Sequence, residues 1–363
     1  MEQNNQNNQN NYYQQEARRF SGQYYQPPVS HNPYNQNAFV QQYQLEQEQK
    51  KKQKHKLMAA GAVIGCAIVA YLVIQVAATS LLAAFDLYDI YTSSPVFQSC
   101  FGIIAVHICS LLVPFGIVAL ILRKSFSGPV IPTEHVKAMT MFSWVSCGMI
   151  WCLISNIVVN IIINIVKEMG YELTQGEMLK PNSVFACIIL VFSTAVIPAI
   201  IEEFAMRCCT LGVLRKYGAG FSVLAVSVVF GLLHGNVIQF VYAFLVGLFL
   251  AYVTINTGSV VPAILIHGFA NGLSVVQDIV KFAADEKTAD NALSAVVVFW
   301  MVSAVIGLIY LIVKKEIIPK KEKFAKIKGD MLSFGEKLLC LIPGFFIPFI
   351  LLIILTATTV HKI

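Results

Sequence analysis

The fold class is visible in residues 182–214, which read NSVFACIILVFSTAVIPAIIEEFAMRCCTLGVL. Apart from Glu202, Glu203 and Arg207, no residue in this stretch carries a charge. A helix needs about 20 mainly apolar residues to cross a bilayer, and this stretch is longer than that. It therefore predicts a membrane-spanning helix with three charged side chains inside the bilayer.

The rest of the chain has the same apolar character. Of its 363 residues, 56% are hydrophobic and 13% are charged, whereas about a quarter of the residues in a soluble domain are charged. This composition argues against a soluble enzyme, a nucleic-acid binder and a secreted disulfide scaffold. We expect an all-α, polytopic membrane helix bundle of about eight or nine transmembrane helices. The expected spans are 57–85, 98–122, 138–166, 182–214, 220–236, 237–256, 259–280, 292–313 and 338–360.

The basic residues predict how the spans are oriented. With the N-terminus in the cytoplasm, 20 of the 26 Lys and Arg residues fall in cytoplasmic segments, as the positive-inside rule requires. The external loops are correspondingly acidic. We therefore expect a multi-pass protein with a cytoplasmic N-terminus and an external C-terminus, and we assign it to a plasma membrane.

The N-terminal region differs in composition from the rest. Residues 1–50 are rich in Gln, Asn and Tyr and contain almost no aliphatic side chains. Such a sequence cannot bury enough apolar surface to fold, so it predicts a disordered cytoplasmic tail. Residues 51–363 are expected to form the transmembrane domain.

Glu202, Glu203 and Arg207 are the first candidate site residues. A charge at the centre of a bilayer costs roughly 2.5 to 3.5 kcal/mol on insertion scales, so these groups must face a protein interior or water. Glu203 and Arg207 lie four residues apart on one helix face and can pair. Glu202 points about 100° away around the helix, which leaves its carboxylate available for chemistry. A buried ion pair that only fixes packing does not explain this second glutamate.

Two further spans carry a histidine pattern, Phe-x-x-x-His at 230–234 and His-x-x-x-Asn at 267–271. The two ends of each pattern share a helix face. Counting about 1.5 Å per residue from an expected turn at 217–218 puts Glu202 and His234 both about 23 to 25 Å from that turn. The predicted buried polar site consists of Glu202, Glu203, His234, His267 and Asn271.

Pro198 lies four residues before Glu202 and has no backbone N–H. It would leave the Thr194 carbonyl without its helical partner. A kink or a widened turn at this point could admit water to the site. The alternative is a proline that the membrane helix merely tolerates.

His107 is interpreted differently from the other membrane histidines. A lone histidine in a span is taken as a packed or hydrogen-bonded residue rather than a catalytic one. His234 and His267 differ from it because of their depth.

A site of this composition supports two kinds of hydrolysis. A carboxylate and an imidazole that share a water can deprotonate it for attack on a carbonyl, while a second imidazole and an amide stabilise the oxyanion. Alternatively, Glu202, His234 and His267 could hold a divalent metal such as zinc, whose bound water is the nucleophile. The sequence has no His-Glu-x-x-His motif, so zincin-type binding is excluded. The cofactor is therefore either such a metal or none.

The motifs follow one another in consecutive spans: Glu-Glu-x-x-x-Arg at 202–207, then the patterns at 230–234 and 267–271. In this order they resemble the CPBP family of intramembrane proteases, also called the Abi family. It includes the type II CAAX prenyl endopeptidases and bacteriocin-processing or immunity proteins. The resemblance covers residues 182–280, approximately. Met206 and Cys208 stand where many members have an aromatic residue and a glycine.

The resemblance implies a role for each site residue. Glu202 would be the catalytic base and would activate water together with His234. His267 and Asn271 would stabilise the oxyanion. The supporting site residues would be Glu203 and Arg207. Members of the family have been described both as metal-dependent and as glutamate-dependent without metal, so the resemblance leaves the cofactor open.

We therefore expect an intramembrane endopeptidase that cuts a membrane-associated peptide or protein, with membrane lipid around it and no nucleic-acid partner. Two alternatives stay open. One is a non-proteolytic protein that gives immunity to a bacteriocin or acts as a membrane scaffold. The other is a proton-coupled carrier, because Glu and His in spans also form proton relays. Inverted repeats would favour the carrier, and the two halves show no obvious repeat.

Overall fold

The computed structural model describes residues 33–125, 132–174, 176, 178–318 and 330–362. Within these residues the protein is a bundle of helices, eight of which are long and apolar enough to cross a membrane. The expected all-α polytopic membrane fold is confirmed. The chain divides into two compact units, Met1–His55 and Lys56–Ile363.

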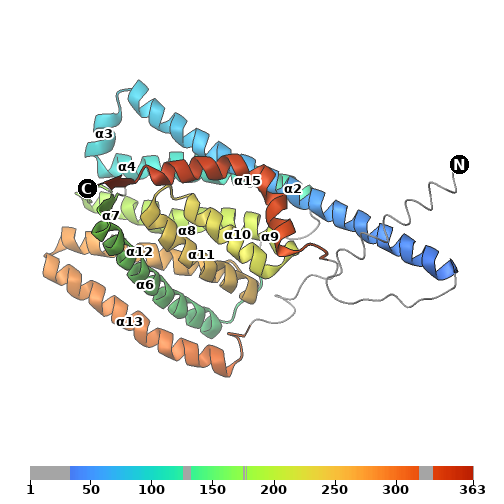
Figure 1. The fold of residues 1–363 in the computed structure, drawn as a ribbon. Coiled ribbons are helices and arrows are strands. Elements are labelled where there is room, and N and C mark those ends of the chain that lie inside the picture. The colour runs from blue at the N-terminus through green and yellow to red at the C-terminus, as the bar shows by residue number, and fades with distance from the viewer. Residues whose placement is uncertain (1–32, 126–131, 175, 177, 319–329, 363) are drawn as a thin grey trace. The chain divides into compact units, whose positions relative to one another are not determined.

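The elements follow one another along the chain as shown in Figure 1. The α-helices are α2 (Pro33–Ala84), α3 (Tyr88–Ser93), α4 (Pro95–Phe101), α5 (Val113–Ser125), α6 (Ala138–Glu168), α7 (Val184–Val191), α8 (Ile197–Glu203), α9 (Leu211–Leu214), α10 (Ala219–Leu232), α11 (Val237–Thr257), α12 (Val261–Ala283), α13 (Glu286–Val313) and α15 (Phe334–Ala357). Three π-helical segments, η1 (Gly102–Leu112), η2 (Phe192–Val196) and η3 (Phe204–Thr210), and one 3₁₀ turn, η4 (Arg215–Tyr217), continue these helices. The strands are β1 (Tyr171–Leu173) and β2 (Val360–Lys362).

The expected count of nine spans is corrected at α10. This helix has 14 residues, so it rises about 21 Å, which is less than the roughly 30 Å of a bilayer core. The chain turns at residues 233–236, where Gly235 has a φ of 66°, and Asn236 caps α11 by accepting the Gln239 N–H at 2.8 Å. The expected fifth span is therefore a short helix.

The helix α2 begins within the region 1–50 that the composition predicts as a tail. The helix begins at Pro33, so residues 33–50 are helical, while residues 1–32 of the expected tail lie outside the described part of the chain. Gln, Glu and Lys are good helix formers, and Gln42 Nε2 donates to Glu46 Oε1 one turn away at 3.2 Å. Extending an existing helix is much easier than nucleating one, so the span carries its polar N-terminal extension with it.

In the unit Lys56–Ile363 the helices pack in layers (Figure 1). The helix α15 contacts α10, α10 forms a hairpin with α11, and α11 packs on α6 and α12, which α13 covers. A Cβ on Gly307 of α13 would come within 2.9 Å of the Ser143 Cα in α6. Helices associate in a membrane through such close backbone packing, because lipid removes the hydrophobic force between them.

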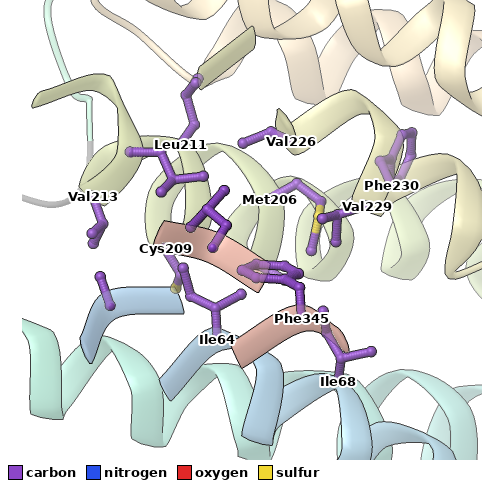
Figure 2. Close-up of a cluster of buried hydrophobic side chains, with 14 of the residues drawn as sticks. Ile64, Ile68, Met206, Cys209, Leu211, Val213, Val226, Val229, Phe230 and Phe345 are labelled. Carbon is purple, nitrogen blue, oxygen red and sulfur yellow. The ribbon is translucent and has the colours of Figure 1, made fainter. Parts of the chain in front are cut away.

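The first and last membrane helices cross at two glycines. A Cβ on Gly65 of α2 would collide with the backbone of Gly344 in α15, so only glycine allows this approach. Figure 2 shows the apolar cluster beside the crossing, where Ile64 and Ile68 of α2 and Phe345 of α15 gather around residues of η3 and α10. This packing anchors the span that carries the charged residues.

The C-terminal segment lies against two loops at one end of the bundle. The strands β1 and β2 are antiparallel, with Tyr171 opposite Lys362 and Leu173 opposite Val360. The Val237 N–H donates to Thr359 Oγ1 at 3.3 Å. The end of the chain thus packs on the turn between α10 and α11.

Candidate active site

Regular helical bonding is interrupted on both sides of the two glutamates. Glu202 and Glu203 end α8, which lies between the π-helical segments η2 and η3. At the end of η2 the Ile197 N–H donates to the Phe192 carbonyl five residues back. Such a bond widens the helix by one residue and is common near functional sites. The widened turn predicted from Pro198 is confirmed.

The Thr194 carbonyl finds its partner in another helix. Asn271 Nδ2 of α12 donates to it at 3.0 Å. This bond replaces the one that Pro198 removes and ties α12 to the widened turn. Asn271 therefore has a structural contact that its sequence position did not reveal, and it retains a second amide N–H.

Glu203 lies between Arg207 and His267 in a buried row of polar side chains. Its Oε2 lies 3.0 Å from Arg207 Nε, and its Oε1 lies 3.0 Å from His267 Nδ1. The predicted pair of Glu203 and Arg207 is thus present, with both side chains 0% exposed. The Arg207 guanidinium also lies 4.8 Å from the centre of the Phe230 ring, where a cation is attracted to the ring face. Because a carboxylate only accepts, His267 Nδ1 carries the hydrogen in this contact.

Glu202 has a different environment from its neighbour. Its Oε2 lies 3.8 Å from His267 Nε2, and its Oε1 lies 3.9 Å from His107 Nδ1. Both distances are too long for a direct hydrogen bond. Glu202 Oε2 and His107 Nδ1 are buried without a hydrogen-bond partner among the residues that the structure describes. The Glu202 carboxylate is therefore held near two imidazoles without being saturated by either.

His234 lies in the turn after α10 with one ring nitrogen engaged. Its Nδ1 lies 2.9 Å from the Phe230 carbonyl, and since a carbonyl only accepts, Nδ1 carries the hydrogen. In the neutral ring, Nε2 is then the basic nitrogen. The Tyr71 hydroxyl of α2 donates to the Leu233 carbonyl at 2.9 Å and fixes this turn from outside the hairpin.

Glu202 and His234 line one cavity of about 260 Å³. Its polar lining consists of Tyr71, Gln75, His107, Glu202, His234 and Gln239. The predicted meeting of Glu202 and His234 at one depth is consistent with this shared cavity. His267 and Asn271 do not line it, although His267 lies beside Glu202.

His107, expected as a packed or hydrogen-bonded residue, lies in the candidate site. The histidine lies in η1, faces Glu202 and lines the same cavity. It is the one ionisable side chain of the apolar stretch 98–122 other than the cysteines. Because ionisable residues inside spans are costly and mark functional sites, the rarity that singled out Glu202 applies to His107 as well. Tyr71, Gln75 and Gln239 carry no comparable signal in the sequence.

The three metal candidates were Glu202, His234 and His267. Within the described part of the chain, no group of three or more His, Cys, Asp or Glu side chains is arranged to hold a metal ion. His267 Nδ1 is bonded to Glu203, and His234 Nδ1 to the Phe230 carbonyl. Both bonds leave Nε2 as the nitrogen through which each ring would bind a metal.

The comparisons with known proteins bear on one segment. Residues 184–273 match the family model described as type II CAAX prenyl endopeptidase Rce1-like. This segment runs from α7 into α12 and contains all six predicted site residues, whereas His107 lies outside it. No curated protein and no solved structure matches the chain. The match covers about a quarter of this multi-pass membrane protein, and in that segment the chain is similar to the CAAX-type peptidases of the CPBP family.

Proposed function

We propose that the protein is an intramembrane endopeptidase that hydrolyses a membrane-associated peptide or protein with water activated by Glu202 and His234. One observation carries this proposal: a histidine and a carboxylate that has no hydrogen-bond partner among the described residues line the same cavity between membrane helices. An ionisable side chain without a counter-charge costs free energy inside a membrane and therefore marks a functional site.

The chemistry requires one base and one proton donor. The Glu202 carboxylate takes a proton from water, and the hydroxide adds to the scissile carbonyl while His234 Nε2 orients the water by accepting its other hydrogen. When the C–N bond breaks, the proton held by Glu202 passes to the leaving amine. The products are a carboxylic acid and an amine, and Glu202 is ionised again.

His267 is proposed to stabilise the oxyanion. Carboxylates lie near both of its nitrogens, Glu203 at 3.0 Å and Glu202 at 3.8 Å, and such a setting stabilises an imidazolium that donates from Nε2. With Arg207 also charged, the two cations and two anions balance within the buried cluster. The remaining N–H of Asn271 is the second proposed donor, and Glu203 and Arg207 hold His267 in place.

The substrate is proposed to reach this cavity from the membrane. A peptide bond buried among lipid needs a site that supplies both water and polar partners, and the cavity brings six polar side chains together. We further propose a plasma-membrane location with a cytoplasmic N-terminus and an external C-terminus, because the basic residues are concentrated in the segments that this orientation places inside.

The test is turnover by the full chain in lipid nanodiscs, with a library of quenched peptides that carry apolar anchors. Glu202→Gln and His234→Ala are each expected to lower kcat/KM by about 10²- to 10⁴-fold, the usual contribution of a general base. Glu286→Gln is the matched control, since Glu286 is 78% exposed in a surface pair with Lys281. Equal turnover by all four proteins would refute the assignment and favour a non-proteolytic immunity or scaffold role.

A further inference from the structure

His107 occupies a position that the proposed chemistry has not used. It lies in η1, on a span separate from those that carry the six predicted site residues and outside the family match at 184–273. Its side chain is 15% exposed, as is that of Glu202. The packing of η1 against α8 therefore brings His107 to the site.

The contacts of Glu202 are arranged symmetrically. His267 Nε2 lies 3.8 Å from one carboxylate oxygen, and His107 Nδ1 lies 3.9 Å from the other. At this distance a carboxylate still attracts an N–H that points at it, although the contact is too long for a hydrogen bond. Because His107 Nδ1 has no hydrogen-bond partner among the described residues, leaving it unjoined would impose the full cost of burying a polar atom.

The local backbone holds His107 toward the cavity. The residue lies in the middle of an 11-residue π-helical segment, in which the wider turn changes the direction of side chains relative to a regular helix. Ser110 Oγ donates to the Val106 carbonyl, and Val106 and Leu111 form the cavity wall beside His107.

We propose that His107 is a positioning residue for Glu202: its Nδ1–H is directed at Oε1 of the carboxylate, 3.9 Å away. This restraint keeps the other oxygen beside His267 and stabilises the ionised carboxylate. The inference rests on the proposed peptidase function for its kinetic consequence, whereas the coupling between His107 and Glu202 does not depend on it.

The kinetic test compares two substitutions of similar size. The Asn amide nitrogen takes the place of a histidine Nδ1, so His107→Asn retains the donor, while His107→Leu fills the space without one. We expect His107→Leu to lower kcat by roughly 10- to 100-fold, as the loss of a hydrogen bond to a charged group does, with KM unchanged. His107→Asn is expected to recover most of this loss. His135→Gln, at an exposed loop histidine, is the matched control.

A second readout needs no substrate. Dicyclohexylcarbodiimide attacks protonated carboxyl groups in apolar surroundings, and mass spectrometry locates the label on Glu202 against a Glu202→Gln background. At one neutral pH, His107→Leu is expected to raise the labelled fraction several-fold, whereas His107→Asn and His135→Gln leave it near the wild-type level. A folded His107→Leu protein with wild-type kcat and wild-type labelling would overturn the proposal. An inactive wild-type chain whose labelling still responds would refute the peptidase and support the coupling.

Discussion

Two adjacent glutamates at the end of α8 have opposite surroundings. Both oxygens of Glu203 lie 3.0 Å from a nitrogen, one from Arg207 Nε and the other from His267 Nδ1. Glu202 has its nearest cationic or imidazole partners at 3.8 and 3.9 Å and lines a cavity. The difference shows how a membrane protein separates two uses of the same side chain. A closely paired carboxylate holds helices together, while one without a close partner among the described residues remains able to exchange protons.

Arg207→Met, which removes the close partner of Glu203, is expected to have the largest effect. Removing one partner of a buried ion pair leaves an uncompensated charge, so we expect the free energy of unfolding to fall by about 3 to 5 kcal/mol. Equilibrium unfolding in mixed micelles with rising SDS measures this loss. Lys281→Met removes the cation of an exposed pair and is expected to cost only about 0 to 1 kcal/mol. Equal losses in the two variants would mean that the buried pair of Glu203 and Arg207 does not stabilise the protein more than an exposed pair does.

A double-mutant cycle tests the bond that joins α12 to the widened turn. Asn271→Ala leaves the Thr194 carbonyl without its donor, which should cost about 1 to 3 kcal/mol of unfolding free energy. Pro198→Ala restores an N–H that can bond this carbonyl within the helix. The cost of Asn271→Ala should therefore shrink in the Pro198→Ala background. Strictly additive losses would show that the two residues do not share the Thr194 carbonyl.

The smallest expected effect concerns the turn that holds His234. Tyr71→Phe removes the hydroxyl bond to the Leu233 carbonyl and should lower the unfolding free energy by about 1 kcal/mol, together with a modest loss of kcat. Tyr252→Phe is its match, because the Tyr252 hydroxyl bonds the Ile317 carbonyl at 2.7 Å away from the cavity. We expect a similar loss of stability there and no change in kcat. If both variants lost kcat, the loss in Tyr71→Phe could not be assigned to the turn that holds His234.

Local rules were enough to predict part of this site from the sequence. The pairing of Glu203 with Arg207 follows from their spacing of four residues on one helix. The widened turn near Pro198 follows from the missing N–H of proline. Each feature depends on residues that are close in sequence, so no knowledge of helix packing was needed to anticipate it.

Features that depend on packing between helices could not be predicted in the same way. The approach of His107 to Glu202 requires η1 to lie against α8, and the bond from Asn271 to Thr194 requires the position of α12. The length of α10 is set by the turn at residues 233–236, within an apolar run that hydropathy alone reads as one span. The helical start of α2 reflects propagation from the span that follows it.

Glu202 serves the chemistry, and Glu203 serves the architecture. This division is tested by turnover per folded molecule and unfolding free energy, measured in parallel for Glu202→Gln and Glu203→Gln. We expect Glu202→Gln to keep wild-type stability to within about 1 kcal/mol and to lose about 10²- to 10⁴-fold in turnover, whereas Glu203→Gln is clearly destabilised. A stable Glu202→Gln protein that turns over substrate at the wild-type rate would contradict it.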